Sequence, residues 1–333
     1  MIIPFFIPHA GCPHQCVFCD QRNITGRKTA DEPSSLHRTV NRYLESRTSE
    51  EPCQIAFYGG TFTALPPATQ KAYLEAAQPF IASGRVRSIR LSTRPDCISR
   101  EVLGLLKEHR VETVELGVQS LDDTVLILSG RGHTAADTVH AARLLREYGF
   151  RVGLQLMPGL PGDSAETFRE TVAGTISLAP DFVRLYPALV IRDTPLEELY
   201  RTNRYAPLAL DEAIAVCKHA LLRFAAKGID VIRIGLQPTE ELEKAGTVIA
   251  GPYHPAFRQL VESAILLDSM RTALEHGKVP ATAVFLVHPL DISNAAGQHR
   301  SNIAALKTQF GLKAVSLRPE SGMPRRTVVL AHV

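Results

Sequence analysis

The chain has 333 residues, of which 45% are hydrophobic, and its mean hydropathy is −0.01. This composition predicts a soluble globular protein, and the longest apolar stretches are too short for a membrane-spanning helix. The net charge of +3 is too small to predict a polyanionic partner on its own. Because the chain exceeds the usual size of one compact core, we expect a large domain and a small one.

Short apolar segments alternate with longer helical patterns through most of the chain. The expected strands are residues 2–7, 54–58, 88–92, 113–118, 151–156 and 182–186. The expected helices between and after them are at about 35–46, 67–82, 100–108, 135–148, 165–177 and 211–227. This alternation predicts parallel strands joined by right-handed crossovers, and therefore an α/β fold with a partial (β/α)6 TIM-type barrel. In such folds the chemistry collects at the carboxyl ends of the strands.

The alternation ends after residue 227. Residues 231–236 read as a further strand, 257–274 as a helix and 277–280 as a linker. We therefore predict three parts, which are a core barrel (1–235), a connecting helical segment (236–280) and a small α+β module (281–333).

The last predicted part carries the whole positive excess of the chain. Its six Lys and Arg residues stand against Asp291 and Glu320, which gives six minus two, or +4. This excess is a hint of nucleic-acid binding, although a solvated basic face explains it equally well.

Three cysteines near the amino terminus follow the spacing C-x-x-x-C-x-x-C. Cys12, Cys16 and Cys19 could ligate three irons of a four-iron cluster and leave the fourth iron free to chelate a small molecule. The alternatives are three core cysteines, or a zinc site with His9 or His14 as the fourth ligand. Closed zinc sites often use two spaced pairs of ligands, and no second pair follows here.

The other three cysteines, Cys53, Cys97 and Cys217, are scattered along the chain. We expect them to be small core hydrophobes in a reducing, cytoplasmic protein rather than partners in disulfides. Residues 1–8 are apolar but lack a basic leader and a small-residue cleavage site, so we interpret them as the first strand and not as a signal peptide.

The cysteine motif resembles that of the radical S-adenosylmethionine (radical SAM) superfamily. The resemblance implies that Cys12, Cys16 and Cys19 hold a [4Fe–4S] cluster, whose free iron binds the methionine end of S-adenosyl-L-methionine. It also implies reductive cleavage of this cofactor to a 5′-deoxyadenosyl radical, which abstracts hydrogen from a substrate at the barrel mouth. Phe18 stands where the superfamily usually has an aromatic residue that touches the adenine.

Further cofactor contacts are expected where the next strands end. Paired glycines allow a close backbone approach, and the resemblance places Gly59, Gly60 and Thr61 at the methionine amino group, although alone they would be an ordinary turn. Hydroxyl, guanidinium and amide groups suit ribose and carboxylate oxygens. The remaining candidates for the cofactor shell are Ser92, Arg94, Gln119 and, by its backbone, Met157, which could equally be part of a Pro/Gly turn.

The sixth strand and its continuation, residues 181–205, resemble the radical SAM domain of the Elongator catalytic subunit, and the resemblance covers about residues 1–205. A basic residue of that family matches Arg184, so we expect Arg184 and Tyr186 to face the substrate, although Tyr186 could simply pack. The Elongator subunit spaces its first two cysteines more widely. It also has an acetyltransferase domain, which we do not expect here.

Residues 284–307 and 313–318 read in order as strand, short helix, loop, helix and strand. This pattern resembles a KH module, whose G-x-x-G loop clamps a nucleic-acid backbone. The loop here runs from Gly297 to Arg300 and lacks the second glycine. Either Arg300 contacts a phosphate instead, or the module is structural.

Together the two resemblances imply an RNA substrate such as tRNA, an electron donor such as flavodoxin or ferredoxin, and no membrane partner. Two alternatives stay open. One is a radical SAM enzyme that acts on a small metabolite such as a porphyrin precursor. The other is a cluster-carrying RNA-binding protein without turnover.

Overall fold

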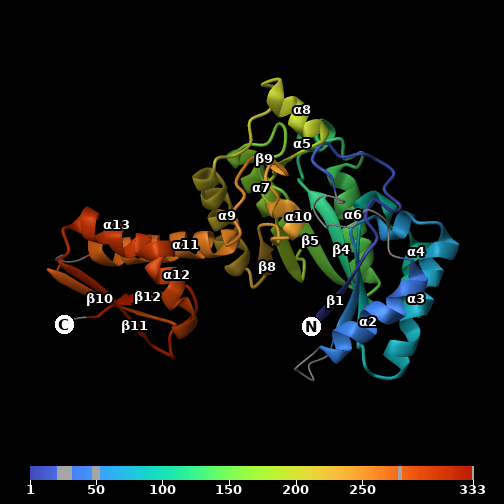
Figure 1. Ribbon diagram of the computed structural model, residues 1–333, viewed down its shortest axis with the longest axis horizontal. Coiled ribbons are helices and arrows are strands. Elements are labelled where there is room, and N and C mark those ends of the chain that lie inside the picture. Colours follow the sequence, from blue (N-terminus) through green and yellow to red (C-terminus); the bar gives the residue numbers. More distant parts are fainter. Residues whose placement is uncertain (21–31, 47–52, 277–279, 332–333) are drawn as a thin grey trace. The chain divides into compact units, whose positions relative to one another are not determined.

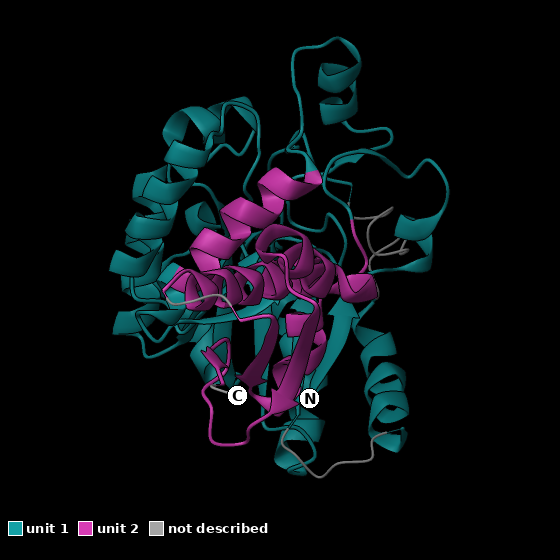
Figure 2. Cartoon of the chain, turned by 90° about the vertical axis from the view of Figure 1, so that its left-hand side faces the viewer, with its two compact units in different colours: residues 1–209, 223–253 teal, residues 210–222, 254–333 magenta. Residues whose placement is uncertain are grey.

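A computed structural model describes residues 1–20, 32–46, 53–276 and 280–331 (Figure 1). Contacts divide the chain into two compact units, where sequence patterns predicted three parts. The first unit holds residues 1–209 and 223–253, and the second holds 210–222 and 254–333 (Figure 2). Most of the predicted linker at 277–280 lies outside the described residues. None of the described helices is long and apolar enough to cross a membrane.

The first unit contains a seven-stranded sheet whose strands are all parallel (Figure 1). The strands, in their spatial order, are β1 (Ile2–Phe6), β2 (Gln54–Tyr58), β3 (Ser88–Thr93), β4 (Val111–Gln119), β5 (Arg151–Leu156), β6 (Phe182–Leu185) and β8 (Asp230–Ile234). The predicted partial TIM-type barrel is therefore confirmed. The further strand that the sequence indicated at 231–236 extends the sheet as β8, beside β6.

The sequence pattern predicted five helices of this unit, which are α2 (Leu36–Glu45), α3 (Pro67–Ala82), α4 (Arg100–Glu108), α6 (Ala135–Glu147) and α7 (Ala165–Ser177). It did not predict α5 (Asp123–Leu128), α8 (Pro195–Arg201) and α10 (Glu240–Glu243), or the short 3-10 turns at Pro33–Ser35, Phe62–Ala64 and Pro95–Cys97. Side-chain caps start several of them, since Ser99 accepts from the Val102 backbone and Thr134 and Ser164 form capping boxes.

The two faces of the sheet differ in polarity. Phe57, Leu91 and Leu116 are fully buried on the outer face, where α4 and α6 contact β4 and α6 contacts β5. The inner face instead carries polar and charged residues. Its floor is Phe182, whose ring lies so close to Gly153 that a Cβ at this glycine would overlap it.

A two-stranded antiparallel ribbon follows the barrel strands. It consists of β7 (Val190–Ile191) and β9 (Val248–Ala250). Leu189, Ile191 and Leu242 form its small apolar cluster, so residues that follow β6 and β8 are joined beyond the sheet.

The second unit contains a three-stranded sheet in the order β11-β10-β12. Its elements after residue 254 are α11 (Phe257–Glu275), β10 (Thr282–Val287), a 3-10 turn (Pro289–Asp291), α12 (Ile292–Ala296), a 3-10 turn (Gln298–Arg300), α13 (Ser301–Phe310), β11 (Ala314–Pro319) and β12 (Val328–Leu330). β10 pairs parallel with β11 and antiparallel with β12. The predicted order of strand, short helix, loop, helix and strand is thus confirmed. Most of α9 (Leu210–Ala225) also belongs to this unit.

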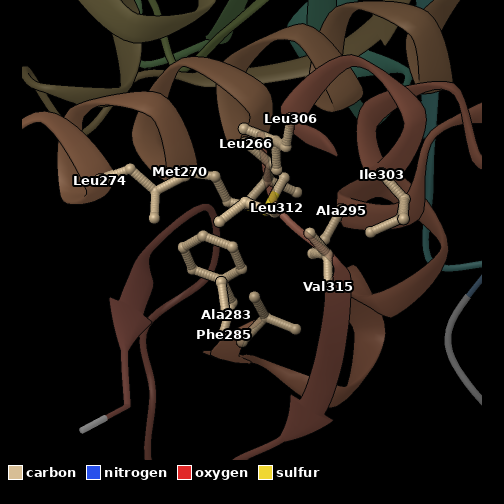
Figure 3. Close-up of a cluster of buried hydrophobic side chains, with 11 residues drawn as sticks. Leu266, Met270, Leu274, Ala283, Phe285, Ala295, Ile303, Leu306, Leu312 and Val315 are labelled. Atoms are coloured by element: carbon tan, nitrogen blue, oxygen red, sulfur yellow. The ribbon is translucent and has the colours of Figure 1, made fainter. Parts of the chain in front are cut away.

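Helix α11 is part of the second unit's core rather than a connector. Leu266, Met270 and Leu274, spaced four residues apart, share one buried cluster with Phe285 of β10 (Figure 3). The sequence predicted this helix but not which element covers it. The expected segment 236–280 is divided between the two units at residue 254.

Buried carboxylates fix the carboxyl-terminal segment of the second unit. Asp291 is fully buried, and its carboxylate accepts hydrogen bonds from Nε of Arg325 (2.9 Å) and from the backbone N–H of Arg326 (2.7 Å). Glu262 of α11 accepts two bonds from the Arg326 guanidinium, at 2.5 and 2.9 Å. The residues just before β12 are therefore tied to α11 and to the turn before α12.

We expect Asp291→Asn to lower the free energy of unfolding at pH 7 by about 1–3 kcal/mol, because hydrogen bonds between charged partners are weakened. Burial alone would raise the pKa of Asp291, but the bonds from Arg325 and Arg326 hold it below its ordinary value of 3.8. The stabilisation is therefore complete above the unfolded-state pKa and is lost as pH falls through the folded-state pKa. Urea unfolding of both proteins at pH 7 and at acid pH measures this, with the exposed Glu320→Gln as control. A difference between Asp291→Asn and wild type that stays the same at acid pH would contradict it.

Candidate active site at the carboxyl ends of the strands

The loop that follows β1 carries the three motif cysteines, and backbone hydrogen bonds fix it on several sides. The N–H of Val17 donates to the carbonyl of Ser129 (3.1 Å), and the N–H of Leu196 donates to the carbonyl of Val17 (2.9 Å). On another side the N–H of Thr61 donates to the carbonyl of Ala10 (2.9 Å). The loop is thus held at the carboxyl ends of the strands, where barrel enzymes place their chemistry.

Glycines allow this loop to approach the segment after β2. A Cβ on Gly60 would lie 2.6 Å from the carbonyl oxygen of Ile7 and closer still to that of Ala10. A Cβ on Gly11 would overlap the carbonyl oxygen of Thr61. In this structure Gly60 therefore lacks a side chain because the loop after β1 and the segment after β2 are in direct backbone contact. The contact of Gly59, Gly60 and Thr61 with a cofactor stays a prediction.

The three thiols lie in a partly buried environment. The Cys12 Sγ is 3.3 Å from the hydroxyl of Thr61, and Nη1 of Arg131 donates to the Cys16 Sγ at 3.1 Å. Burial, together with the charges of Cys16 and Cys12, raises the pKa of the Cys19 thiol to about 12. Within the described residues, no three His, Cys, Asp or Glu side chains are already gathered as a metal site.

The donor set nevertheless fits an iron–sulfur cluster. Three thiols on one loop are the ligand type that such clusters use. Their mutual repulsion as thiolates is unfavourable in this buried place unless a cationic centre lies among them, and bound iron would supply that charge. Cys12, Cys16 and Cys19 are thus the residues that would hold the cluster.

Sequence reasoning missed a segment beside the cysteine loop, Gly130-Arg-Gly-His133. Arg131 is buried and donates to Cys16 and to the carbonyl of Gly117, while its own carbonyl accepts from Arg94. A Cβ on Gly132 would lie 2.5 Å from the His14 ring. The sequence did contain a signal for this segment, which is an arginine between two glycines after a short helix that follows a strand.

His133 is buried at the same place. Burial and the charges of Arg131 and Arg94 lower its pKa to about 4, so the imidazole is neutral near pH 7. Neither ring nitrogen forms a hydrogen bond of good geometry with another described residue. A buried imidazole with two unpaired nitrogens marks this position as part of the site rather than of the apolar core.

The polar residues predicted for the cofactor shell lie in two different settings. Arg94 is buried and engaged, because its guanidinium bonds both oxygens of Asp96 (3.0 Å each) and the carbonyl of Arg131. Gln119 ends β4 with a positive φ of 70°, and its Oε1 accepts from Nε2 of Gln155 (3.2 Å). Ser92 is partly exposed on the inner face of β3. Arg94 therefore braces two loops, whereas Gln119 and Ser92 line the barrel.

The two residues predicted to touch adenine come together in space. Phe18 of the cysteine loop and Met157 after β5 pack against one small apolar cluster, formed by Val125, Leu160 and Ala188. Phe18 and Met157 are far apart in the sequence, but in the folded chain they contact the same apolar cluster. Such a surface suits the face of an aromatic base.

Deeper in the barrel, the carboxylate of Glu115 gathers several side chains. Its Oε2 is 2.7 Å from Nε of Arg184, and its Oε1 accepts from Arg184 (3.1 Å), Arg90 (3.2 Å) and the hydroxyl of Tyr58 (2.8 Å). Nη1 of Arg184 also donates to the Tyr186 hydroxyl at 3.2 Å. The structure therefore brings the predicted pair Arg184 and Tyr186 together.

This network is electrostatically coupled. Burial and the Glu115 charge raise the pKa of Tyr58, so its phenol stays protonated. Burial disfavours the charged form of Arg184, yet Glu115 raises its pKa and keeps it cationic. Sequence reasoning missed Glu115 and Arg90, because each lies inside a strand whose polar alternation resembles that of an ordinary exposed face.

Comparison with known proteins assigns the class. Residues 6–173, half of the chain, match the radical SAM superfamily, and residues 180–266 match the Radical_SAM C-terminal domain. With its three-cysteine loop at the mouth of a partial TIM-type barrel, the chain belongs to the radical SAM superfamily. It is accordingly a radical SAM enzyme, with a [4Fe–4S] cluster and S-adenosylmethionine as cofactors.

Its relatives include Elongator-type proteins, as the sixth strand indicated. The tRNA uridine(34) acetyltransferase of Methanocaldococcus infernus is 31% identical over 253 residues, 63% of this chain and 47% of that protein. Elongator complex protein 3 of Danio rerio is 30% identical over 258 residues, 62% of this chain and 46% of that protein.

A solved structure of Methanocaldococcus infernus Elp3 with an N-terminal deletion has the same fold. It superposes with a TM-score of 0.62 at 23% identity, over 79% of this chain and 62% of that one. The chain spans about half the length of the curated relatives above. The likeness therefore concerns the radical SAM part of those proteins.

Proposed function

We propose that this radical SAM enzyme modifies RNA, and tRNA in particular. The observation that carries the proposal is the 31% identity, across 253 residues, with a protein named for its action on tRNA uridine(34). Because the similarity covers less than half of that relative, acetyl transfer is not part of the proposal.

In this proposal the cofactors supply the radical chemistry, and the residues at the carboxyl ends of the strands bind and position the cofactors. When bound, the cluster supplies the electron that breaks the sulfonium bond of S-adenosylmethionine. Phe18 and Met157 cover the adenine and keep water from it, while Gly59, Gly60 and Thr61 contact the methionine end. Ser92 and Gln119 bind ribose or carboxylate oxygens, and Arg94 acts as a brace that keeps Arg131 beside Cys16.

On the substrate side, Arg184 and Tyr186 are the groups that meet the RNA. Arg184 is cationic, and its side chain keeps 15% of its surface exposed within the barrel. The bond from Arg184 to the Tyr186 oxygen fixes the phenol and leaves its own hydrogen free to donate.

The second unit supports an RNA substrate through its charge. Arg300, Lys307, Lys313 and Arg318 are all exposed, and none forms an ion pair with another described residue. The acids Asp291 and Glu262 of this unit are already neutralised internally by Arg325 and Arg326. Unpaired exposed cations bind phosphate backbones without regard to sequence.

The test measures turnover and binding separately. The anaerobic, cluster-loaded enzyme, reduced with dithionite, should form 5′-deoxyadenosine, and total tRNA should increase its yield. Filter binding to tRNA should weaken steeply with salt. Formation of 5′-deoxyadenosine without any tRNA affinity would favour a small-metabolite substrate. Salt-sensitive tRNA binding without 5′-deoxyadenosine would instead indicate a binding protein, and either result would contradict the proposal.

A pair of variants locates the RNA-binding surface. Arg300→Gln combined with Lys313→Gln should weaken tRNA binding, and the slope of log affinity against log salt should fall by about 1 for each phosphate that the protein no longer neutralises. Lys71→Gln combined with Arg85→Gln, which removes two exposed charges from the first unit, is the matched control. Equal weakening in the two double variants would contradict a specific role of the second unit.

A further inference from the structure

The inner face of the barrel sheet carries more positive than negative charge. Among the described strands β2 to β8, its guanidinium groups are Arg90, Arg151, Arg184 and Arg233, and its buried carboxylate is Glu115. Asp230 on this face is exposed at the first position of β8, and Glu112 accepts a hydrogen bond from Ser88 of the same face (2.9 Å) with 39% of its side chain exposed. If the side chains on this face only filled the barrel, we would expect their buried positive and negative charges to be equal in number.

The arginines are not equally accessible. Arg90 belongs to the floor, because its side chain is 7% exposed and its guanidinium lies over the Phe182 ring at 5.4 Å. Arg184 lies farther toward the carboxyl ends with 15% of its side chain exposed, and Arg233 is also partly exposed. Arg151 lies at the opposite, amino end of the sheet and pairs with Asp181. The charges of Arg184 and Arg233 are therefore the ones on the side from which a substrate would enter.

Arg184 and Arg233 are partners in the register between β6 and β8. The register shifts by one residue just before this pair, which places Arg233 rather than Ile232 beside Arg184. In-register residues of neighbouring strands lie about 5 Å apart and on the same face. The spacing refers to the backbone, and it places two cationic side chains on one face of neighbouring strands. Like charges on one face repel each other, and an anion bound there would reduce the repulsion.

Each of these two arginines is also held in place by a neutral group. Arg184 donates to the Tyr186 hydroxyl, and Nη2 of Arg233 donates to Oε1 of Gln237 at 2.9 Å. Gln237 is neutral and leaves the charge of Arg233 uncompensated. The single carboxylate of Glu115 is shared by Arg90 and Arg184, so these three groups together also keep one positive charge. Guanidinium groups match the oxygen geometry of phosphate by parallel hydrogen bonds.

We infer that Arg184 and Arg233 form an anion site on the inner face of the barrel, which takes a phosphate group of the substrate. Glu115 and Tyr58 fix Arg184 from below, while Gln237 fixes Arg233. The choice of phosphate rests on the RNA substrate proposed above. The site would hold the phosphate of the reacting nucleotide and so fix where its base and sugar lie at the barrel mouth.

The experiment uses the cluster-loaded full-length enzyme and equilibrium dialysis with uridine 5′-monophosphate. We expect saturable binding that inorganic phosphate displaces, whereas uridine without phosphate should bind far more weakly. Equal binding of the nucleotide and the nucleoside would overturn the inference. Displacement of the nucleotide by free methionine would also overturn it, since the site would then belong to the carboxylate of the cofactor.

Variants assign the binding to the two arginines. Arg233→Gln and Arg184→Gln should each raise the dissociation constant for the nucleotide about tenfold or more, as expected when charge-assisted bonds are removed. Arg151→Gln, at the amino end of β5 with 57% of its side chain exposed, is the matched control and should leave it unchanged. Because Arg184→Gln also leaves Glu115 with fewer partners, the decisive variant is Arg233→Gln. Wild-type affinity in Arg233→Gln would contradict the site.

The outcome separates this site from the RNA proposal. If tRNA binds in a salt-dependent way but uridine 5′-monophosphate does not, the anion site is wrong and the RNA substrate stands. If the nucleotide binds through both arginines and tRNA has no affinity, the RNA substrate is wrong, and the site serves a smaller phosphorylated substrate.

Discussion

Cys16→Ala is expected to abolish both cluster assembly and the formation of 5′-deoxyadenosine. Cys16 is the most buried of the three motif cysteines, and its sulfur accepts the hydrogen bond from Arg131. Two remaining thiolates cannot hold three corners of a cubane, so iron should be lost on gel filtration. Iron and acid-labile sulfide per chain, the charge-transfer absorption of the cluster and the product assay measure the effect.

The matched control for this variant is Cys53→Ala. Cys53 is fully buried at the start of β2, and its thiol donates to the carbonyl of Arg85, away from the loop. This variant should lose some stability, as core truncations do, but keep its iron. A Cys16→Ala protein with a full complement of iron and sulfide would show that the cluster lies elsewhere.

Gly60→Ala is expected to have the second-largest effect, because the new methyl group would collide with backbone rather than with a movable side chain. The Cβ would lie 2.6 Å from the carbonyl oxygen of Ile7 and still closer to that of Ala10. Overpacking of this kind costs about 1–3 kcal/mol when the surroundings can shift. The shift here would displace the cysteine loop, so we expect poor retention of the cluster together with lower stability.

Gly104→Ala in α4 is the matched control for this methyl group. Apart from the neighbouring backbone of its own helix, a Cβ at Gly104 has no atom within 4 Å, and alanine is the better helix former by about 1 kcal/mol. This variant should therefore keep its iron and unfold at an equal or higher urea concentration. Full iron content in Gly60→Ala would contradict the proposed dependence of the site on the contact between the two loops.

Much of the barrel could be predicted from the sequence, because its signals are local. Short, largely apolar runs such as 54–58 and 151–156 form mostly buried parallel strands, and their sequence pattern differs from that of amphipathic helices. The cysteine motif and the Gly-Gly turn lie directly at strand ends. Parallel strands bring such ends to one edge, so the place of the site followed from the order of the elements.

The contacts that could not be predicted join residues far apart in the sequence. Glu115 and Arg184 read as isolated charges in two strands, and only the register of the sheet shows that they pair. Arg131 was missed, because its bond to Cys16 depends on how two loops fold over each other. Cys97 was expected in the core, but it is partly exposed beside Arg94 and Asp96, whereas Cys53 and Cys217 are buried as expected.

Contacts group the elements after residue 209 differently from the three expected parts. The helix α11 was predicted from the sequence, but its buried face packs against β10, which follows after the predicted linker. Periodicity shows which face of a helix is buried and not what covers that face. The grouping of α11 with the second unit therefore required the structure.

The iron that has no cysteine ligand can be examined by electron paramagnetic resonance. Spectra of the anaerobically reduced enzyme are recorded with and without S-adenosylmethionine. If three thiolates leave one iron open, the cofactor should bind that iron and change the spectrum. Addition of the amino acid methionine, which carries the same chelating groups, should produce a related but distinct change. A reduced cluster whose spectrum is indifferent to S-adenosylmethionine, or a protein that holds one zinc ion in its place, would contradict the assignment of Cys12, Cys16 and Cys19.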